Sequence, residues 1–361
     1  MKRMWSRLFA GLRQRGRRLR LRIRRPGTCA TIWVVSAAIV VHAATRPHYG
    51  GTLRIEVRQS IETADPPQSG PGMADLTGPF SITRWEGGRL ALYSANDDAP
   101  SGRPFVDSVE VQMGRSLRDQ AFDLEAGKAD IVELGPLEAR RPGSARKVWT
   151  SAPVRLFALV FAPRVTDPRV REALALAVDR GAIHSVLLQR QGEVSGGLLP
   201  QWISGYAFLF PVASDAARAR SLTAALPAQA RALALSFDDG ALRPIAERIA
   251  LNARDGGLAV ALGPSNANTD VRLVEARITT TDPYQALVRI AAALGLPEPA
   301  HGNTPEALFA AERALLDGFR VIPLFHVPDV YGVSPRVRGG QAITPLGEWR
   351  FENLWLEGNR P

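Results

Sequence analysis

The chain is poor in metal-binding and redox side chains. Among 361 residues there is one cysteine, Cys29, and five histidines. No cysteine follows residue 43, which excludes disulfides, thiol catalysis and thiolate metal sites from the rest of the chain. The histidines beyond that point, His48, His184, His301 and His326, include no pair spaced four residues apart. We therefore expect no metal and no cofactor.

Motifs of catalysis are missing as well. The sequence has no GxGxxG after a strand, no GxxxxGK[ST], no HExxH and no GxSxG. His184 is followed by Ser185, but neighbouring side chains on a helix point about 100° apart and cannot form a nucleophile and base pair. These absences predict a protein that is not an enzyme.

The excess of positive charge is confined to one end of the chain. The formal charge is +10, from 45 basic and 35 acidic residues. Residues 1–43 contain 11 of the basic residues and no acidic one, so the remaining chain has 34 basic against 35 acidic residues. A folded part with this balance gives no support to binding of nucleic acid.

A basic stretch at the N-terminus, Lys2 to Arg25, precedes an apolar run of 15 residues, Ala30 to Ala44. A membrane span needs about 20 residues. The run ends in Val41-His42-Ala43, with small residues at the positions that signal peptidase requires. We predict a signal peptide, 1–43, cleaved after Ala43, and a periplasmic or extracytoplasmic location. An uncleaved membrane anchor remains the alternative, because the basic stretch is unusually long.

Strand and helix patterns alternate along the rest of the chain. Alternating or continuous apolar residues predict strands over 52–58, 80–85, 89–94, 106–113, 129–134, 154–161, 232–237, 258–262, 270–275 and 319–325. Helical spacing and caps predict helices over 117–126, 167–188, 242–254, 283–294 and 304–318. Two blocks of strands alternating with helices indicate two α/β lobes.

Several segments resemble one protein family in order. They are GGTLRIEVRQSIETADP (50–66), GPFSITRWEGGRLALYSA (78–95), LEAGKADIVEL (124–134), DPRVREALALAVDRGAIHSVLL (167–188) with GLLP (197–200), and VIPLFHVPDVYGVSPRVRG (321–339). The chain resembles the family-5 extracellular solute-binding proteins, the peptide and nickel receptors of ABC importers. In that family an accessory domain follows the first strand. Here only the loop 66–77 stands in its place, which implies a reduced form.

The resemblance implies a two-lobe α/β fold of the periplasmic-binding-protein type (type II). Lobe 1 is expected over 44–205, completed by 332–361, and lobe 2 over 206–331, with connecting strands near 205–215 and 325–335 acting as a hinge. It implies a monomer that binds a peptide-like or other small solute between the lobes and delivers it to the permease of an ABC importer. The alternative is a degenerate scaffold that acts as a sensory or protein-interaction partner without transport.

The matching segments also imply ligand-binding residues at strand ends and loops. They are Glu56, Ser60, Glu62, Trp202, Arg277, Thr279, Asp282 and His326. Thr279 stands where peptide-binding members have the aspartate that binds the ligand's amino group. A hydroxyl cannot neutralise a buried ammonium, so recognition of a free amino terminus is not expected at this position.

Overall fold

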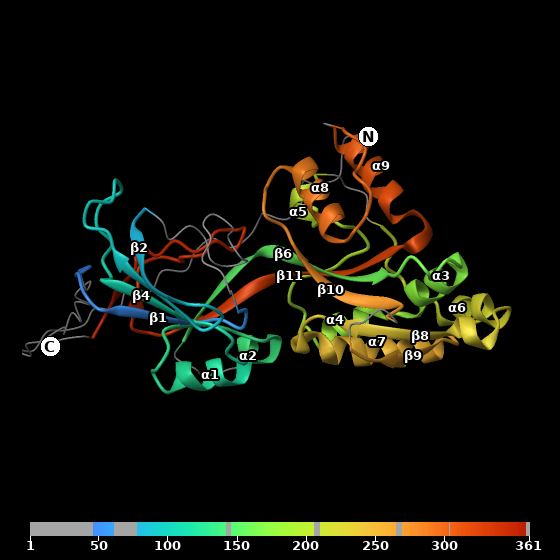
Figure 1. Ribbon diagram of the computed structural model, residues 1–361, viewed down its shortest axis with the longest axis horizontal. Helices are drawn as coiled ribbons and strands as arrows, with labels where there is room; N and C mark the ends of the chain where they lie inside the picture. Colours follow the sequence, from blue (N-terminus) through green and yellow to red (C-terminus); the bar gives the residue numbers. More distant parts are fainter. Residues whose placement is uncertain are drawn as a thin grey trace, which may run out of the picture. The chain divides into compact units, whose positions relative to one another are not determined.

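The computed structural model describes residues 46–60, 78–141, 146–205, 210–264, 269–302 and 304–358. Residues Arg46–Pro361 form one compact unit (Figure 1). The predicted signal peptide, the loop 66–77 and Glu62 lie outside the described residues. No helix in the described ranges is both long and apolar enough to cross a membrane.

One mixed sheet runs through the described chain. Its strands are β1 (Thr52–Glu56), β2 (Phe80–Glu86), β3 (Leu90–Ala95), β4 (Ser108–Gln112), β5 (Ile131–Glu133), β6 (Lys147–Phe161), β7 (Glu193–Val194), β8 (Ala232–Phe237), β9 (Ala259–Leu262), β10 (Val271–Arg277) and β11 (Val321–Val333). Their order is β2-β3-β4-β1-β5-β11-β6-β10-β8-β9, and β7 pairs with β11. Two short strands, β12 (Val337–Arg338) and β13 (Trp355–Leu356), form a separate ribbon.

Each end of the sheet is an α/β arrangement with parallel pairs. At one end β1 pairs in parallel with β4 and β5, and at the other β8 pairs in parallel with β9 and β10. The long antiparallel pair β6 and β11 joins the two ends. Figure 1 shows these two strands passing from the β1–β5 elements to the β8–β10 elements.

The described helices mostly begin where a side chain caps the first turn. They are α1 (Leu117–Glu125), α2 (Pro136–Arg140), α3 (Pro168–Ala177), α4 (Arg180–Val186), α5 (Gln201–Ser204), α6 (Ala216–Ala224), α7 (Arg243–Asp255), α8 (Pro283–Ala293) and α9 (Pro305–Leu316), with 3-10 turns η1 (Ala228–Arg231), η2 (Gly240–Leu242) and η3 (Asp317–Phe319). Asp167, Asp282 and Thr304 each accept a hydrogen bond from a first-turn backbone N–H, and a proline follows each. The starts at Asp167 and Thr304 confirm the caps expected there, whereas Asp282 was expected to bind a ligand.

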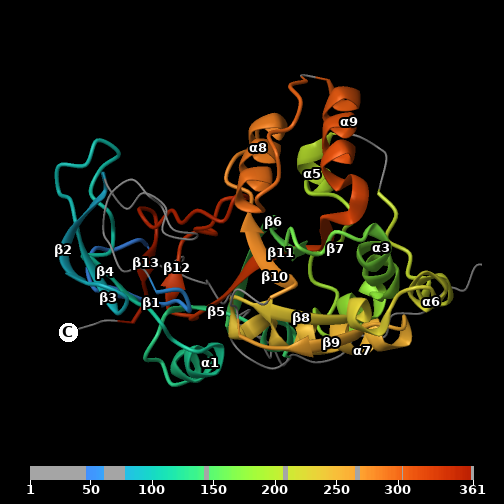
Figure 2. The same cartoon turned by 45° about the vertical axis from the view of Figure 1, so that its right-hand side comes forward.

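The second α/β end is covered on both faces because side chains alternate along β6. Phe157 and Leu159 pack with α3, α4 and α7, whereas Leu156 and Ala158 pack with α5, α8 and α9. Figure 2 shows α8 and α9 on one side of these strands and α7 on the other. The nearly continuous apolar sequence of this strand follows from burial on both faces.

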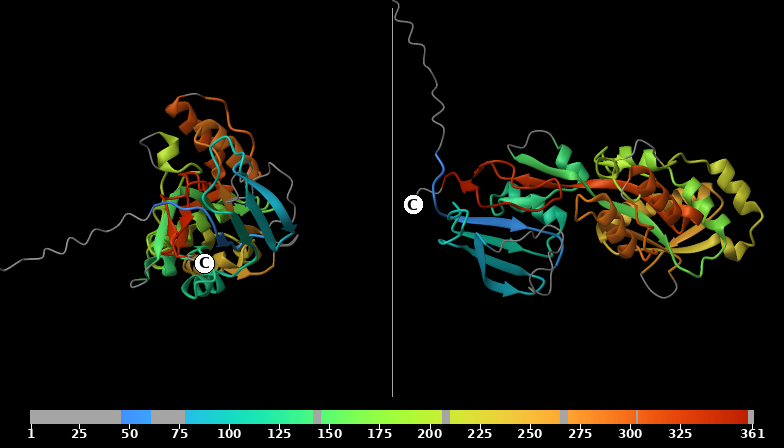
Figure 3. Two further views of the ribbon diagram at one scale, coloured as in Figure 1. Left: turned by 90° about the vertical axis from the view of Figure 1, so that its left-hand side faces the viewer. Right: turned by 90° about the horizontal axis from the view of Figure 1, so that it is seen from above.

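The first α/β end has its own core. Leu53, Val109 and Val111 pack with Trp349 and Phe351 from the C-terminal segment. Figure 3 shows this red segment beside the blue and cyan strands β1 to β4. The end of the chain thus returns to its first strands.

Three details differ from the sequence-based expectation. The helix predicted over 167–188 is two helices, because Val178 leaves the helical conformation and the Asp179 side chain caps α4 at Ala182 N. The strands predicted over 154–161 and 319–325 extend to 147 and 333. These two strands connect the halves of the sheet, whereas residues 210–215 contain no strand.

The lobe boundaries stay predictions. One core cluster contains Leu159 and Leu174 from before the expected boundary at residues 205/206, and Leu235 and Ile249 from after it. This packing favours a boundary within β6 and β11 instead.

Candidate functional site

A cavity of about 430 Å³ lies between the two α/β ends of the sheet. Its walls come from α1 and α2 on one side and from α4, η2 and α7 on the other, and its floor comes from β6, β10 and β11. The polar residues that line it are Arg58, Arg118, Glu133, Glu138, Arg155, Gln191, Glu275, Asp329 and Tyr331. A pocket of this volume suits a small ligand.

The centre of the floor is a carboxylate shared by two arginines. Asp329 Oδ2 lies 2.6 Å from Arg277 Nη2, and its Oδ1 lies 3.1 Å from Arg155 Nε. Glu275 Oε2 is 3.5 Å from Arg155 Nη1. These four residues come from β6, β10 and β11, so the ion pairs tie three adjacent strands together.

Local backbone features place Asp329 there. It lies at an irregularity of β11, where the register with β6 shifts on both sides of Pro328. Proline has no N–H for the ladder, and such bulges re-aim the neighbouring side chain. A turn covers the pair at Gly347 (φ 83°), where a Cβ atom would overlap Arg277 Nη2 and Asp329 Oδ2, so only glycine fits.

A second ion-pair chain crosses from one wall to the other. Glu133 Oε2, at the end of β5, accepts a 2.8 Å hydrogen bond from Arg58 N. The Arg58 guanidinium reaches Asp239 Oδ2 at 2.7 Å, on the η2 side of the cavity. Burial raises the pKa of Glu133, and the neighbouring Arg58 opposes that shift. Arg58 therefore links the two sides directly.

The surroundings of Tyr331 and Arg155 fix the protonation states of these two floor residues. Burial raises the pKa of Tyr331, and the charges of Asp329 and Glu133 raise it further, so the phenol stays protonated. The carboxylates of Glu275 and Asp329 raise the pKa of Arg155 despite its burial. The floor thus presents a neutral hydroxyl and a permanent cation.

Apolar side chains form most of the walls. Leu117, Leu134 and Phe157 lie among the lining residues, as do Leu242 and Ile245. On the opposing helices α2 and α4, Leu137 and Val186 also line the cavity, and each is 64% exposed. The arrangement is an ionic floor below apolar walls, which can hold a ligand that has both apolar and polar groups.

None of the seven described residues predicted for binding lines this cavity. Arg277 comes nearest, because it contacts Asp329 directly. Glu56 is buried at the end of β1, where burial and the charge of Asp123 raise its pKa to about 7. His326 is fully buried, its Nε2 lies 3.0 Å from Leu198 O, and burial lowers its pKa to about 4.

The other predicted residues lie at the surface. Asp282 caps α8 by accepting from Gln285 N, and Thr279 Oγ1 accepts a 2.9 Å hydrogen bond from Arg289 Nη1. Trp202 Nε1 donates to Pro153 O at 3.2 Å, and Ser60 is exposed. Their contact with a ligand stays a prediction.

Sequence reasoning missed the floor residues Arg155, Glu275 and Asp329. The available signal was a charged residue inside a strand that is otherwise apolar, such as the arginine in VRLFALVF. A charge in such a place needs a partner.

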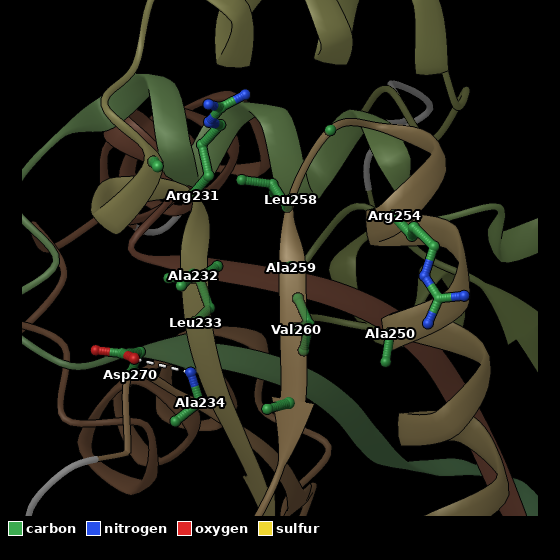
Figure 4. A pocket seen from close by; sticks show the side chains of 13 residues that line it. Arg231, Ala232, Leu233, Ala234, Ala250, Arg254, Leu258, Ala259, Val260 and Asp270 are labelled. Atoms are coloured by element: carbon green, nitrogen blue, oxygen red, sulfur yellow. Dashed lines mark hydrogen bonds between the residues drawn. The ribbon is translucent and has the colours of Figure 1, made fainter.

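A second hollow, of about 830 Å³, lies along β8 and the edge strand β9 (Figure 4). Alanines at 232, 234, 259 and 261 line it, with Arg231 and Arg254 among its few polar groups. Its only carboxylate, Asp270, already accepts from Ala234 N at 2.8 Å, as the dashed line in Figure 4 shows. Although larger, this hollow is open and lacks converging polar groups, so the cavity over β6 and β11 is the better candidate.

No cluster of three or more metal-ligating His, Cys, Asp or Glu side chains occurs within the described ranges.

Several solved structures share the fold of this chain. NikA from Staphylococcus aureus, solved in complex with Ni(L-His)2, superposes with a TM-score of 0.67 at 14% identity over 77% of this chain and 68% of its own. The oligopeptide-binding protein AppA from Bacillus subtilis, solved with a nonapeptide, gives 0.62 at 15% identity over 78% of this chain and 66% of its own. The fold is that of the periplasmic binding proteins, as expected.

The family follows from the sequence. The sequence model of the bacterial extracellular solute-binding proteins, family 5 (middle region), matches residues 18–285, and the chain belongs to that family. The probable ABC transporter periplasmic-binding protein SapA of Escherichia coli (strain K12) is 23% identical over 171 residues, 46% of this chain and 31% of SapA. The matches thus span about a third or less of the curated relatives' length. The resemblance seen in the sequence is confirmed.

Proposed function

We propose that this protein is an extracytoplasmic solute-binding protein of an ABC importer. It binds a peptide-like or other small solute in the cavity between its two α/β ends and presents the solute to a membrane permease. The observation that carries the proposal is the position of the cavity. Both ends of the sheet contribute its walls, and the two strands that connect the ends form its floor. A ligand there contacts both lobes at once and favours their closed arrangement.

The relatives support this reading. They are named as binding proteins, and several of the solved structures contain a peptide or a nickel complex. The lack of catalytic motifs agrees with a binding role, because capture of a solute needs no nucleophile.

Native mass spectrometry of the gently purified protein tests the proposal. A bound species that is lost on mild activation is the expected result. Small-angle scattering before and after removal of that species should show a more compact protein with the ligand. A protein that carries no small molecule and does not respond to a broad solute screen would instead support the alternative, a scaffold that interacts with other proteins.

A further inference from the structure

The charged side chains at the cavity floor already form ion pairs with one another. The ionic groups that line the floor, or pair directly with those that do, are Arg58, Arg155, Arg277, Glu133, Asp239, Glu275 and Asp329. Every arginine among them has a carboxylate within 4 Å, and every carboxylate has an arginine. Three cations against four anions leave a balance of one negative charge.

Two further charged residues line the cavity. Arg118 on α1 and Glu138 on α2 have no ion pair with any described residue. They carry opposite charges; Arg118 is exposed to solvent, whereas Glu138 is half-buried. An exposed charge such as that of Arg118 contributes about 0–1 kcal/mol to an ionic contact.

A charged group on a ligand would therefore find no free counter-charge at the floor. It would lose its hydration and compete for its partner with an ion pair that is already formed, which is unfavourable where the pair is mostly buried, as at Asp329. A neutral polar group has no such cost, because it can donate to a carboxylate oxygen or accept from an arginine N–H while the ion pairs persist. The apolar walls add a gain of about 25 cal/mol for each Å² of apolar ligand surface that they cover.

We infer that the cavity selects a small, electrically neutral solute with apolar side groups and uncharged polar groups, such as a peptide blocked at both ends. This inference rests on the proposed function and names its ligand class.

Calorimetry with the full-length protein and one dipeptide in three forms tests the inference. The probes are leucyl-leucine, its N-acetyl derivative with a free carboxylate, and the N-acetyl amide. We expect the neutral N-acetyl amide to bind about tenfold more tightly than either charged form, a difference of about 1.4 kcal/mol. A charged form that binds as tightly or more tightly overturns the inference, although binding of any form still supports the proposed function. No binding of all three forms at about 1 mM also overturns it. The native mass spectrum then judges the proposed function separately.

A change of charge at the floor provides a second readout. Glu275→Gln removes one of the two carboxylates that neutralise Arg155, so affinity for the acetylated acid should rise severalfold relative to the amide. The matched control is Glu247→Gln, an exposed side chain of α7 paired with Arg243 outside the lining residues. It should leave the ratio unchanged. An equal ratio in Glu275→Gln and the control would show that the floor charges do not set the preference.

Discussion

The strongest test of what stabilises the cavity floor is a substitution of Asp329, whose carboxylate is shared by two arginines. Its side chain is 9% exposed, and those of Arg277 and Arg155 are 14% and 22% exposed. Asp329→Asn keeps the shape of the side chain but removes its charge. Arg155 then retains one carboxylate partner, Glu275 at 3.5 Å, beside its hydrogen bond to Pro328 O, and Arg277 retains a hydrogen bond to Leu346 O but no carboxylate.

The expected loss of unfolding free energy in Asp329→Asn follows from the burial of the ion pairs. Removing one partner of a buried ion pair costs about 3–5 kcal/mol, because the remaining charge is left without compensation. The asparagine carbonyl can still accept one hydrogen bond, which places the expected loss near the lower end, about 3 kcal/mol. With a urea m-value of about 3 kcal/mol/M, the unfolding midpoint should fall by about 1 M.

Equilibrium urea unfolding of Asp329→Asn beside Glu247→Gln measures this effect. The control breaks an exposed pair on α7, in which the side chains are 68% and 54% exposed, and should cost less than about 0.5 kcal/mol. If the two variants lost equal stability, the floor would not be a buried charge network, and the inference about neutral ligands would lose its basis.

Three other predictions follow from single features. Arg58→Gln removes the ion pair to Asp239, which is worth about 0.2–1 kcal/mol, and should increase the radius of gyration in small-angle scattering at low salt; an unchanged curve would contradict a bridging role. Burial raises the pKa of Glu312 to about 7 from 4.5, so the folded state binds more protons between these values and stability falls as pH rises through them. Glu312→Gln should flatten that dependence of Tm on pH, whereas an unaltered slope would assign it to other groups. N-terminal sequencing of the exported protein should begin near Ala44, and an intact Met1 in the membrane fraction would indicate an anchor.

Local elements were predictable because their signals are local. Asp282 with Pro283 and Thr304 with Pro305 mark helix starts within two residues, and the structure confirms both. The break after α3 was missed because the apolar spacing continues across it. The cap at Asp179 depends on one side-chain hydrogen bond, to Ala182 N, which competes with continuation of the helix.

The lengths of β6 and β11 were missed for a different reason. Their added segments, KVWTSAP and HVPDVYGV, contain prolines and polar residues that normally end a strand. Distant partners satisfy these groups: Ser151 Oγ accepts from Asp329 N at 2.8 Å, and Arg155 Nη2 donates to Pro328 O at 3.0 Å. Single-strand patterns cannot show that such partners exist.

The candidate site was missed for the same reason, because its residues come together only in the folded chain. Arg155, Glu275 and Asp329 lie 120 and 54 residues apart along the chain, and only the strand order β11-β6-β10 makes them neighbours. Sequence resemblance directed attention to strand ends such as Thr279 and Asp282, where family motifs are recognisable. A charge within a buried strand must find a counter-charge on an adjacent strand. In a two-lobe protein, such charges should therefore be sought first on the strands that connect the lobes. Where these charged side chains neutralise one another, they also determine whether a charged ligand can bind.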